Sequence, residues 1–219
     1  MKRLTRAQDE AAARLLNAEL SGRALSIGGV WEGFAKGPGL DSLAVLDLSP
    51  EMLATYAPRG VEPIVGDLYA KEFADASFDG IVFALILHHV ARGGWAECRA
   101  RIREALSRAR RWLKPGGRVF VLEYCPAPAW MPLQRLGLPF TKLFLRAVGQ
   151  PLVVMHEVSF YEEELARAGF ADVRTRRIGA PGASDWTWFP VFMGARWPKL
   201  PLKVYPKMHL IDARKAPVI

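Results

Sequence analysis

Five short apolar runs, separated by helical or loop segments, constrain the fold of this chain more than any other feature of its sequence. The runs cover residues 24–27, 43–48, 61–65, 80–87 and 118–124. Short runs that are apolar almost throughout are typical of parallel strands, because helices between such strands cover both faces of the sheet. The order of the runs therefore predicts an α/β domain with a mostly parallel sheet.

Two long helices are predicted around these strands. Residues 5–20 form the first, because their apolar side chains recur on one face, and the Ser-Gly pair at 21–22 ends it. Residues 95–113 form the second, and the sequence Lys-Pro-Gly-Gly at 114–117 then turns the chain into the strand at 118–124. The inward face of this second helix is expected to consist of Trp95, Cys98, Ile102, Ala105, Ala109 and Trp112.

The pattern changes after residue 124. Residues 125–158 are predicted as an inserted lid that contains a helical stretch with one apolar face. A helix at 159–168 follows, with Ser159 as its N-cap and Glu162 as the capping-box partner. Residues 171–178 and 189–196 are predicted as a hairpin, and the Pro- and Lys-rich residues 197–219 as a basic tail. The domain is thus expected to span residues 1–196.

A glycine turn and an acidic residue suggest a nucleotide-like ligand. The first strand runs into Gly28 and Gly29, and Asp47 follows Gly28 by 19 residues at the end of the second strand. Glycines let backbone N–H groups approach a ligand closely, and an acid at this spacing can bind both hydroxyls of a ribose. A tight connection without any ligand uses the same glycines, so the turn alone leaves both interpretations open.

The residues after Asp47 strengthen the ligand interpretation. In the segment Asp-Leu-Ser-Pro-Glu-Met-Leu at 47–53, Ser49 is the expected N-cap of a helix and Pro50 its first residue. Asp67 places a second acid after the third strand. Because the carboxyl ends of parallel strands line the crevice in which such sheets bind ligands, both acids are expected at the same edge.

These motifs resemble the class I S-adenosylmethionine-dependent methyltransferases, within their broad small-molecule and quinone or lipid group. The resemblance runs from about residue 25 to residue 196 and includes the segment YEEELARAGF at 161–170. It implies a Rossmann-like, doubly wound, mostly parallel seven-stranded sheet with a C-terminal antiparallel hairpin. It also implies S-adenosylmethionine as the cofactor and methyl transfer to a small, hydrophobic acceptor.

The same resemblance implies roles for residues at the strand ends. Asp47 would bind the ribose hydroxyls, and Leu48 and Met52 would pack on the adenine. Asp67 would accept a hydrogen bond from the adenine amino group, and Leu68 would offer its backbone N–H. The full set implied for the cofactor is Gly28, Gly29, Glu32, Asp47, Leu48, Met52, Asp67, Leu68 and Ala84.

The glycine turn departs from the family pattern. Members of the family usually have an acid two residues before the first glycine and further glycines at alternate positions, where this chain has Ser26, Val30 and Glu32. Two interpretations stay open. Glu32 replaces the missing carboxylate at the ammonium group of the cofactor, because a charge-assisted hydrogen bond can be made from either position, or Val30 and Trp31 fill the pocket and the cofactor is not bound. Retained binding is the hypothesis adopted. Ala84, at the end of the fourth strand, would lie near the sulfonium.

Methyl transfer requires alignment of donor and acceptor and, for a weak nucleophile, removal of a proton. His88 and His89 follow the fourth strand and are candidate bases, although such a pair also serves to cap a helix or to fill the core. Tyr161 is a third catalytic candidate. The residues expected to contact the acceptor are Tyr124, Trp130, Met131, Phe140, Phe144 and His156. Four scattered histidines and two cysteines predict no metal site.

Positive charge distinguishes this chain from an average protein. The net charge is +8, and the sequence places much of the excess on the helix at 95–113, in the lid and in the tail. Because the arginine run on this helix has no interleaved exposed aromatic residues and forms no recognised nucleic-acid module, nucleic acid is not expected as the substrate. The apolar and basic segment at 130–154 is expected to cover an apolar substrate, to contact an anionic membrane surface, or both.

Location and assembly follow from weaker signals. Two cysteines and the absence of a secretory signal favour the cytoplasm, with peripheral contact to a membrane. The tail and the first helix are candidate surfaces for a homodimer. Two other functions stay open: a methyltransferase fold that catalyses a non-methylating reaction, and a cofactor-free binding protein at a membrane surface.

Overall fold

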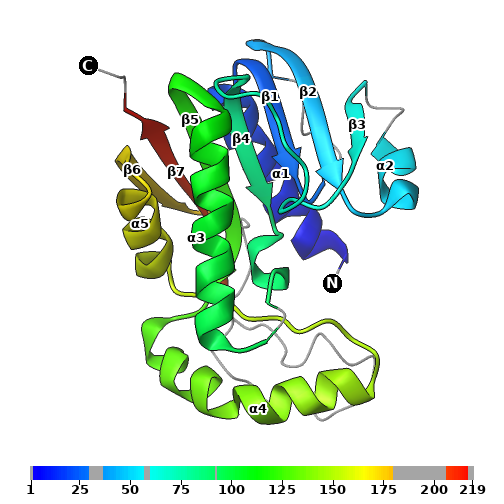
Figure 1. Cartoon of the computed structure of the whole chain (residues 1–219), viewed down its shortest axis with the longest axis vertical. Helices are drawn as coiled ribbons and strands as arrows, with labels where there is room; N and C mark the ends of the chain where they lie inside the picture. The colour runs from blue at the N-terminus through cyan, green and yellow to red at the C-terminus, as the bar shows by residue number, and fades with distance from the viewer. Residues whose placement is uncertain (1, 30–36, 57–59, 92, 180–205, 217–219) are drawn as a thin grey trace.

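Parallel strands form the centre of a seven-stranded sheet (Figure 1) in the computed structural model, which describes residues 2–29, 37–56, 60–91, 93–179 and 206–216. The sheet order is β3-β2-β1-β4-β5-β7-β6. The parallel strands are β1 (Gly22–Ile27), β2 (Leu40–Asp47), β3 (Glu62–Val65), β4 (Phe78–Ala84) and β5 (Leu113–Cys125). The remaining strands, β6 (Phe170–Arg177) and β7 (Lys207–Lys215), pair in antiparallel fashion. This topology confirms the predicted fold class.

The order of the strands creates a switch point in the middle of the sheet. The chain begins at β1, moves outward through β2 and β3, and then returns to β4 on the other side of β1. Connections therefore leave the carboxyl ends of β1 and β4 in opposite directions, and the crevice that results is where open α/β sheets bind their ligands.

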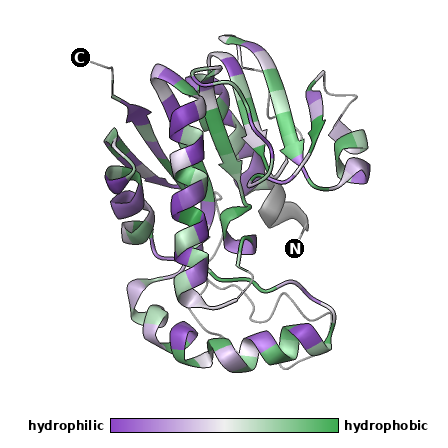
Figure 2. Cartoon of the chain, in the orientation of Figure 1, coloured by the Kyte–Doolittle hydropathy of each residue, from purple (hydrophilic) through white to green (hydrophobic). Residues whose placement is uncertain are grey.

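Helices cover both faces of the sheet, as the apolar strands require. α1 (Lys2–Glu19) and α2 (Pro50–Tyr56) pack on one face, against strand residues such as Val45, Val82 and Phe120. α3 (Trp95–Trp112) and α5 (Val158–Arg167) pack on the other face, against Leu46, Phe83 and other residues of alternate register. Figure 2 shows the hydrophobic residues concentrated along the central strands.

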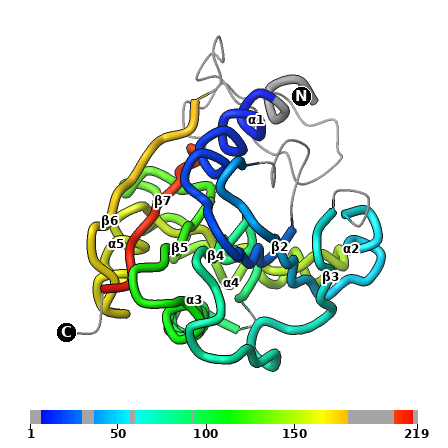
Figure 3. Tube along the Cα trace, turned by 90° about the horizontal axis from the view of Figure 1, so that it is seen from above, coloured from blue at the N-terminus to red at the C-terminus, as the bar shows by residue number. Residues whose placement is uncertain are grey.

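α4 (Met131–Ala147) lies beyond the carboxyl ends of the parallel strands, at the base of the molecule in Figure 1 and beneath the sheet in Figure 3. The lid role of residues 125–158 stays a prediction. Leu138 is buried, whereas the other large apolar residues of this segment are exposed: Leu133, Leu136, Phe140, Leu143, Phe144 and Val148. In the described part of the chain, no helix has the length and apolar character needed to cross a membrane.

The capping box predicted at the start of α5 is wrong. The helix begins at Val158, and Glu157 occupies the N-cap position without a side-chain capping bond. Glu162 instead accepts a hydrogen bond from the Thr175 hydroxyl at 2.6 Å, which ties α5 to β6. Glu162 thus forms a hydrogen bond with a neighbouring strand in place of the predicted capping bond within α5.

The second strand of the terminal hairpin lies within the segment predicted as a tail. β7 spans Lys207–Lys215 and inserts between β5 and β6, so the sheet does not end at residue 196. Residues 189–196, which were predicted as this strand, lie outside the described residues. Buried Leu210 and Ile211 face opposite sides of the sheet, which explains why a segment with so many basic residues is an interior strand.

An ionic cluster holds β7 in place. The fully buried carboxylate of Asp212 accepts hydrogen bonds from Arg118 of β5 and from Arg174 and Arg176 of β6. Glu19, at the end of α1, pairs with the same three arginines. A buried charge is tolerated only when it is paired, so this cluster fixes which strands flank β7.

Candidate active site

The glycine turn after β1 has a backbone that only glycine adopts easily. Gly28 and Gly29 have φ angles of +93° and +125°. A Cβ atom on Gly29 would lie 2.6 Å from the Tyr56 hydroxyl oxygen, so a side chain would not fit. Ser26, which stands where the family has an acid, donates a hydrogen bond from its hydroxyl to the Gly29 carbonyl at 2.6 Å. Ser26 therefore stabilises the turn, while Glu32 lies outside the described residues and its role stays a prediction.

Asp47 ends β2 with its carboxylate at the edge of the crevice. Its Oδ1 atom accepts a hydrogen bond from the Ser49 backbone N–H at 2.9 Å. Ser49 in turn accepts a hydrogen bond from the Met52 N–H at 3.1 Å, which confirms Ser49 as the N-cap of α2. These bonds orient the Asp47 carboxylate and the first turn of α2 relative to each other.

Three apolar side chains near Asp47 are exposed to an unusual degree. Leu48, Met52 and Val65 are 68%, 47% and 58% exposed, and they lie at the carboxyl ends of β2 and β3 or in the first turn of α2. Isolated exposed residues are common, but an apolar group beside a carboxylate matches the chemistry of a nucleoside, which has a flat base and a ribose diol.

The remaining predicted cofactor residues lie along the same edge. Asp67 follows β3 and accepts a hydrogen bond from the Tyr69 backbone N–H at 2.7 Å. Leu68 is buried beneath it, and Ala84 is buried at the end of β4, next to the switch point. The structure therefore brings Gly28, Gly29, Asp47, Asp67 and Ala84 to one edge of the sheet, as the sequence predicts.

His88 forms a contact that the sequence does not reveal. It lies in the 3-10 turn Leu87–His89 after β4, and its Nδ1 atom is 2.6 Å from Glu123 Oε2. The other oxygen of Glu123 accepts the Leu87 backbone N–H at 2.7 Å, and the carboxylate is fully buried near the end of β5. When His88 donates its Nδ1 proton to Glu123, its Nε2 atom is left as an acceptor, which is the arrangement of an oriented general base. An acid inside the apolar run 118–124 was the only available signal.

His89 is a poor candidate for a base near neutral pH. Its ring centroid lies 4.1 Å from that of His88. Although part of its side chain is exposed, desolvation of the ring and then the neighbouring His88 lower the pKa of His89 to about 4. A base works best when its pKa lies near the working pH, which argues against His89, whereas the contact with Glu123 favours His88.

Two predicted site residues lie in the core instead. Tyr161 is fully buried on α5, and burial raises the pKa of its hydroxyl well above the usual value. His156 is buried against Trp95 and Phe160, with its Nε2 atom 3.6 Å from Cys98 Sγ. Burial, and then the charge of Arg99, lower the pKa of His156 to about 3. We therefore correct both assignments: both side chains are packed in the core, although the Tyr161 hydroxyl has no hydrogen-bond partner among the described residues.

The other predicted acceptor contacts surround the carboxyl edge. Tyr124 lies near the end of β5, and Trp130 and Met131 lie where the chain enters α4, all of them partly buried. Phe140 and Phe144 are exposed along α4. Their contact with an acceptor stays a prediction. In the described residues no group of three or more His, Cys, Asp or Glu side chains could hold a metal ion.

Residues 27–121 match the methyltransferase domain family. Over 135 residues, the chain is 31% identical to phosphoethanolamine N-methyltransferase 1 of Triticum aestivum. The matched region covers 58% of this chain and 23% of that protein. It is also 33% identical over 103 residues to the ubiquinone/menaquinone biosynthesis C-methyltransferase UbiE of Roseobacter denitrificans, covering 43% of this chain and 38% of that protein. The chain thus spans less than half the length of either relative.

Solved structures share the fold over nearly the whole chain. One is the 1,6-didemethyltoxoflavin-N1-methyltransferase of Burkholderia thailandensis, determined with bound 1,6-didemethyltoxoflavin and S-adenosylhomocysteine. Its TM-score is 0.63 at 19% identity, and the match covers 96% of this chain and 79% of that chain. At this identity the likeness shows the fold alone. The family match and the relatives support the resemblance drawn from the sequence.

Proposed function

We propose that this chain, which its family match and fold identify as a class I S-adenosylmethionine-dependent methyltransferase, transfers a methyl group from S-adenosylmethionine to a small, hydrophobic acceptor. One observation supports this most directly. The Asp47 carboxylate lies at the carboxyl end of β2, next to the strand β1 that borders the switch point, and exposed Leu48 and Met52 follow it in the chain. This is the combination that a ribose and an adenine ring require.

The described residues fit the cofactor. Asp47 would bind the ribose hydroxyls, and Leu48 and Met52 would pack on the adenine. Asp67 would accept a hydrogen bond from the adenine amino group. Gly28 and Gly29 give the turn its positive φ angles, and the methionine part of the cofactor would lie against this turn. Bound S-adenosylmethionine supplies an electrophilic methyl group. The protein has to align the acceptor with it and to manage the acceptor's proton.

His88 is the proposed general base. Glu123 orients the imidazole so that Nε2 is free to accept a proton, and it stabilises the positive charge that the ring then gains. Glu123 is a positioning residue, because it acts through His88. An acceptor with an acidic O–H, N–H or S–H would require this base, whereas an amine that is already neutral would not.

The acceptor is proposed to be apolar because of α4. This helix lies across the carboxyl edge of the sheet, and Trp130, Met131 and Phe144 are placed near its two ends. Closure of an apolar segment over the crevice would exclude water from the reacting atoms. Glu32 completes the proposal as the partner of the cofactor's ammonium group.

The exposed apolar residues of α4 support a second, compatible role. Leu136, Phe140 and Leu143 recur on the helix surface, and Arg135, Lys142 and Arg146 accompany them. Such a helix can lie in the interface of an anionic membrane. We propose that the protein works in the cytoplasm and reaches apolar acceptors at a membrane surface. Pairing of two copies through the tail or α1 stays a further proposal.

Calorimetric titration with S-adenosylhomocysteine, followed by a screen of apolar acceptors for release of this product from S-adenosylmethionine, tests the proposal. Binding together with product formation supports a methyltransferase. Binding without product for any acceptor, but with conversion of the acceptor, would favour a non-methylating reaction. If no heat is observed, the cofactor-free binding function replaces the proposal, and co-sedimentation with anionic vesicles would then test it.

A further inference from the structure

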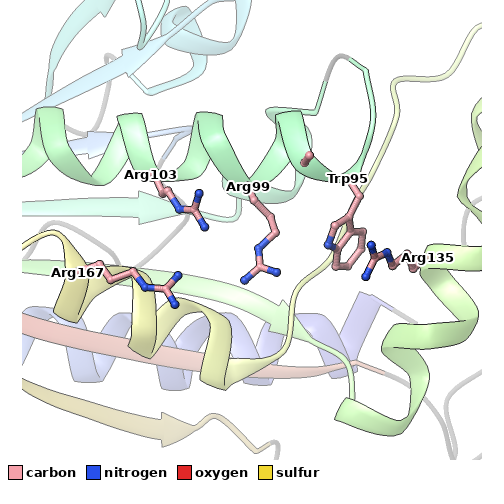
Figure 4. Close-up of a pocket in the computed structure, with 6 residues that line it drawn as sticks. Trp95, Arg99, Arg103, Arg135 and Arg167 are labelled. Atoms are coloured by element: carbon pink, nitrogen blue, oxygen red, sulfur yellow. The ribbon is translucent and has the colours of Figure 1, made fainter.

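A pocket lined by four arginines lies between α3, α4 and α5, and it shares no residue with the proposed cofactor site. Its volume is about 410 Å³, within the range of roughly 300–1,000 Å³ that is typical of small-molecule sites. Figure 4 shows Arg99 and Arg103 extending from α3, Arg167 from α5, and Arg135 from α4 beside the indole of Trp95. The lining is completed by Ala96.

Two of these arginines are neutralised by neighbouring carboxylates. The buried Glu164 accepts hydrogen bonds from Arg103 at 2.6 and 2.9 Å and from Arg167 at 2.8 Å. Glu163 lies 3.3 Å from the second terminal nitrogen of Arg167. Two carboxylates therefore balance these two guanidinium groups and hold them at the pocket wall.

The other two arginines lack such partners. In the part of the chain that the structure describes, neither Arg99 nor Arg135 forms a hydrogen bond or ion pair with a protein group. The Arg99 guanidinium carbon lies 4.5 Å from the centroid of the Phe160 ring, which fixes the side chain in the pocket. Its Nε atom is buried without a hydrogen-bond acceptor.

We propose that this pocket binds the phosphate group of a phosphorylated ligand. Arg99 and Arg135 leave two positive charges unbalanced, which a phosphate carrying close to two negative charges compensates. Planar guanidinium groups donate paired hydrogen bonds to phosphate oxygens, and the terminal nitrogens of Arg99 and Arg135 are the proposed donors. Trp95 offers an apolar ring to the organic part of the ligand.

Two sources of phosphate share this chemistry. One is a soluble phosphorylated small molecule, and the other is the headgroup of a phospholipid, because Arg135 belongs to the same helix as the exposed apolar residues of α4. The pocket does not depend on methyl transfer. Its binding can be measured without cofactor, and a failure here leaves the proposed activity untouched.

The first test is a titration of the full chain with inorganic phosphate, in which the ¹H–¹⁵N NMR signals of the arginine Nε–H groups are monitored. The Arg99 signal should shift with phosphate and not with chloride at equal ionic strength. Arg99→Gln and Arg135→Gln should each weaken phosphate binding about tenfold. Arg146→Gln, which removes one charge elsewhere on α4, is the matched control and should leave it unchanged. The proposal is overturned if chloride shifts the Arg99 signal as much as phosphate does, or if Arg146→Gln weakens phosphate binding as much as the pocket variants do.

Vesicles then separate the two sources. A phospholipid headgroup is the ligand if the protein co-sediments with phosphatidylcholine vesicles that contain phosphatidic acid but not with vesicles of phosphatidylcholine alone. In that case Arg135→Gln should reduce co-sedimentation more than Arg146→Gln does. Phosphate binding that depends on the pocket without vesicle binding identifies a soluble ligand. Arg135 is exposed, so its substitution should not unfold the protein even if that of Arg99 does. Unchanged S-adenosylhomocysteine binding in both variants shows that the cofactor site is intact.

Discussion

The Nδ1 atom of His88 lies 2.6 Å from the Oε2 atom of Glu123, a residue 35 positions away in the sequence and fully buried in the sheet. The turn after β4 thereby meets the end of β5, and one of two adjacent histidines becomes an oriented base. His89, its neighbour, has no such carboxylate partner among the described residues.

Substitution of His88 should therefore affect chemistry more than binding. We expect His88→Gln to lower kcat by about 10²-fold or more for an acceptor that must lose a proton. Glu123→Gln should lower kcat in the same direction by a smaller factor, because the amide still accepts the Leu87 N–H but no longer stabilises a charged ring. Release of S-adenosylhomocysteine under saturating cofactor measures both effects.

His89→Gln is the matched control for this prediction, and it should change kcat by less than the His88 variant does. A long-range ¹H–¹⁵N spectrum gives a second readout, in which His88 should carry its proton on Nδ1. A proton on Nε2, or a larger loss of kcat in His89→Gln, would contradict the assignment.

The role of Asp47 is tested by binding alone. Asp47→Asn retains an oxygen that can accept the Ser49 N–H, so α2 should start unchanged, but the negative charge that would bind the ribose hydroxyls is lost. The Kd for S-adenosylhomocysteine should rise about tenfold or more in calorimetry. Asp41→Asn, on an exposed residue at the opposite end of β2, should bind as the unmodified protein does. Equal affinities for the Asp47 variant and the unmodified protein would exclude Asp47 from the site.

Acid should destabilise the fold partly through His156. Burial, and then Arg99, lower the pKa of His156 to about 3, whereas the ordinary value is 6.5. Between these values the unfolded state binds a proton that the folded state does not, so the free energy of unfolding decreases as the pH falls, by at most about 1.4 kcal/mol per pH unit. The free energy of unfolding, measured with urea, should decrease between pH 7 and pH 5 by about 2 kcal/mol less in His156→Phe than in the unmodified protein. Equal losses would show that His156 is already charged in the folded state.

The cluster around Asp212 should be important for stability. Asp212→Ala removes a fully buried carboxylate and leaves Arg118, Arg174 and Arg176 with Glu19 alone, so the free energy of unfolding should decrease by about 3 kcal/mol. Asp75→Ala removes a largely exposed partner of Arg111 and should cost less than about 1 kcal/mol. Urea unfolding measures both. Similar small losses would show that β7 is held by its apolar residues rather than by its charges.

Local patterns were sufficient for much of this architecture. The apolar runs predicted β1 to β5 because strands buried on both faces cannot contain many polar residues. Ser49 was identifiable as an N-cap because its partner, the Met52 N–H, is only three residues away. Asp47 and Asp67 were predicted at one edge because parallel strands bring their carboxyl ends together.

Long-range contacts decided the rest. Whether Glu162 caps α5 or bonds to Thr175, and whether a basic C-terminal segment is a tail or the strand β7, depends on partners that no local pattern specifies. Asp212 and Arg118 are 94 residues apart, and Cys98 and His156 are 58 apart. By itself, then, the sequence determined the five parallel strands and the edge of the sheet at which Asp47 and Asp67 lie. Only the tertiary structure separated His88 from His89, moved Tyr161 and His156 into the core, and gathered four arginines around one pocket, because burial and charge pairing are properties of the folded chain.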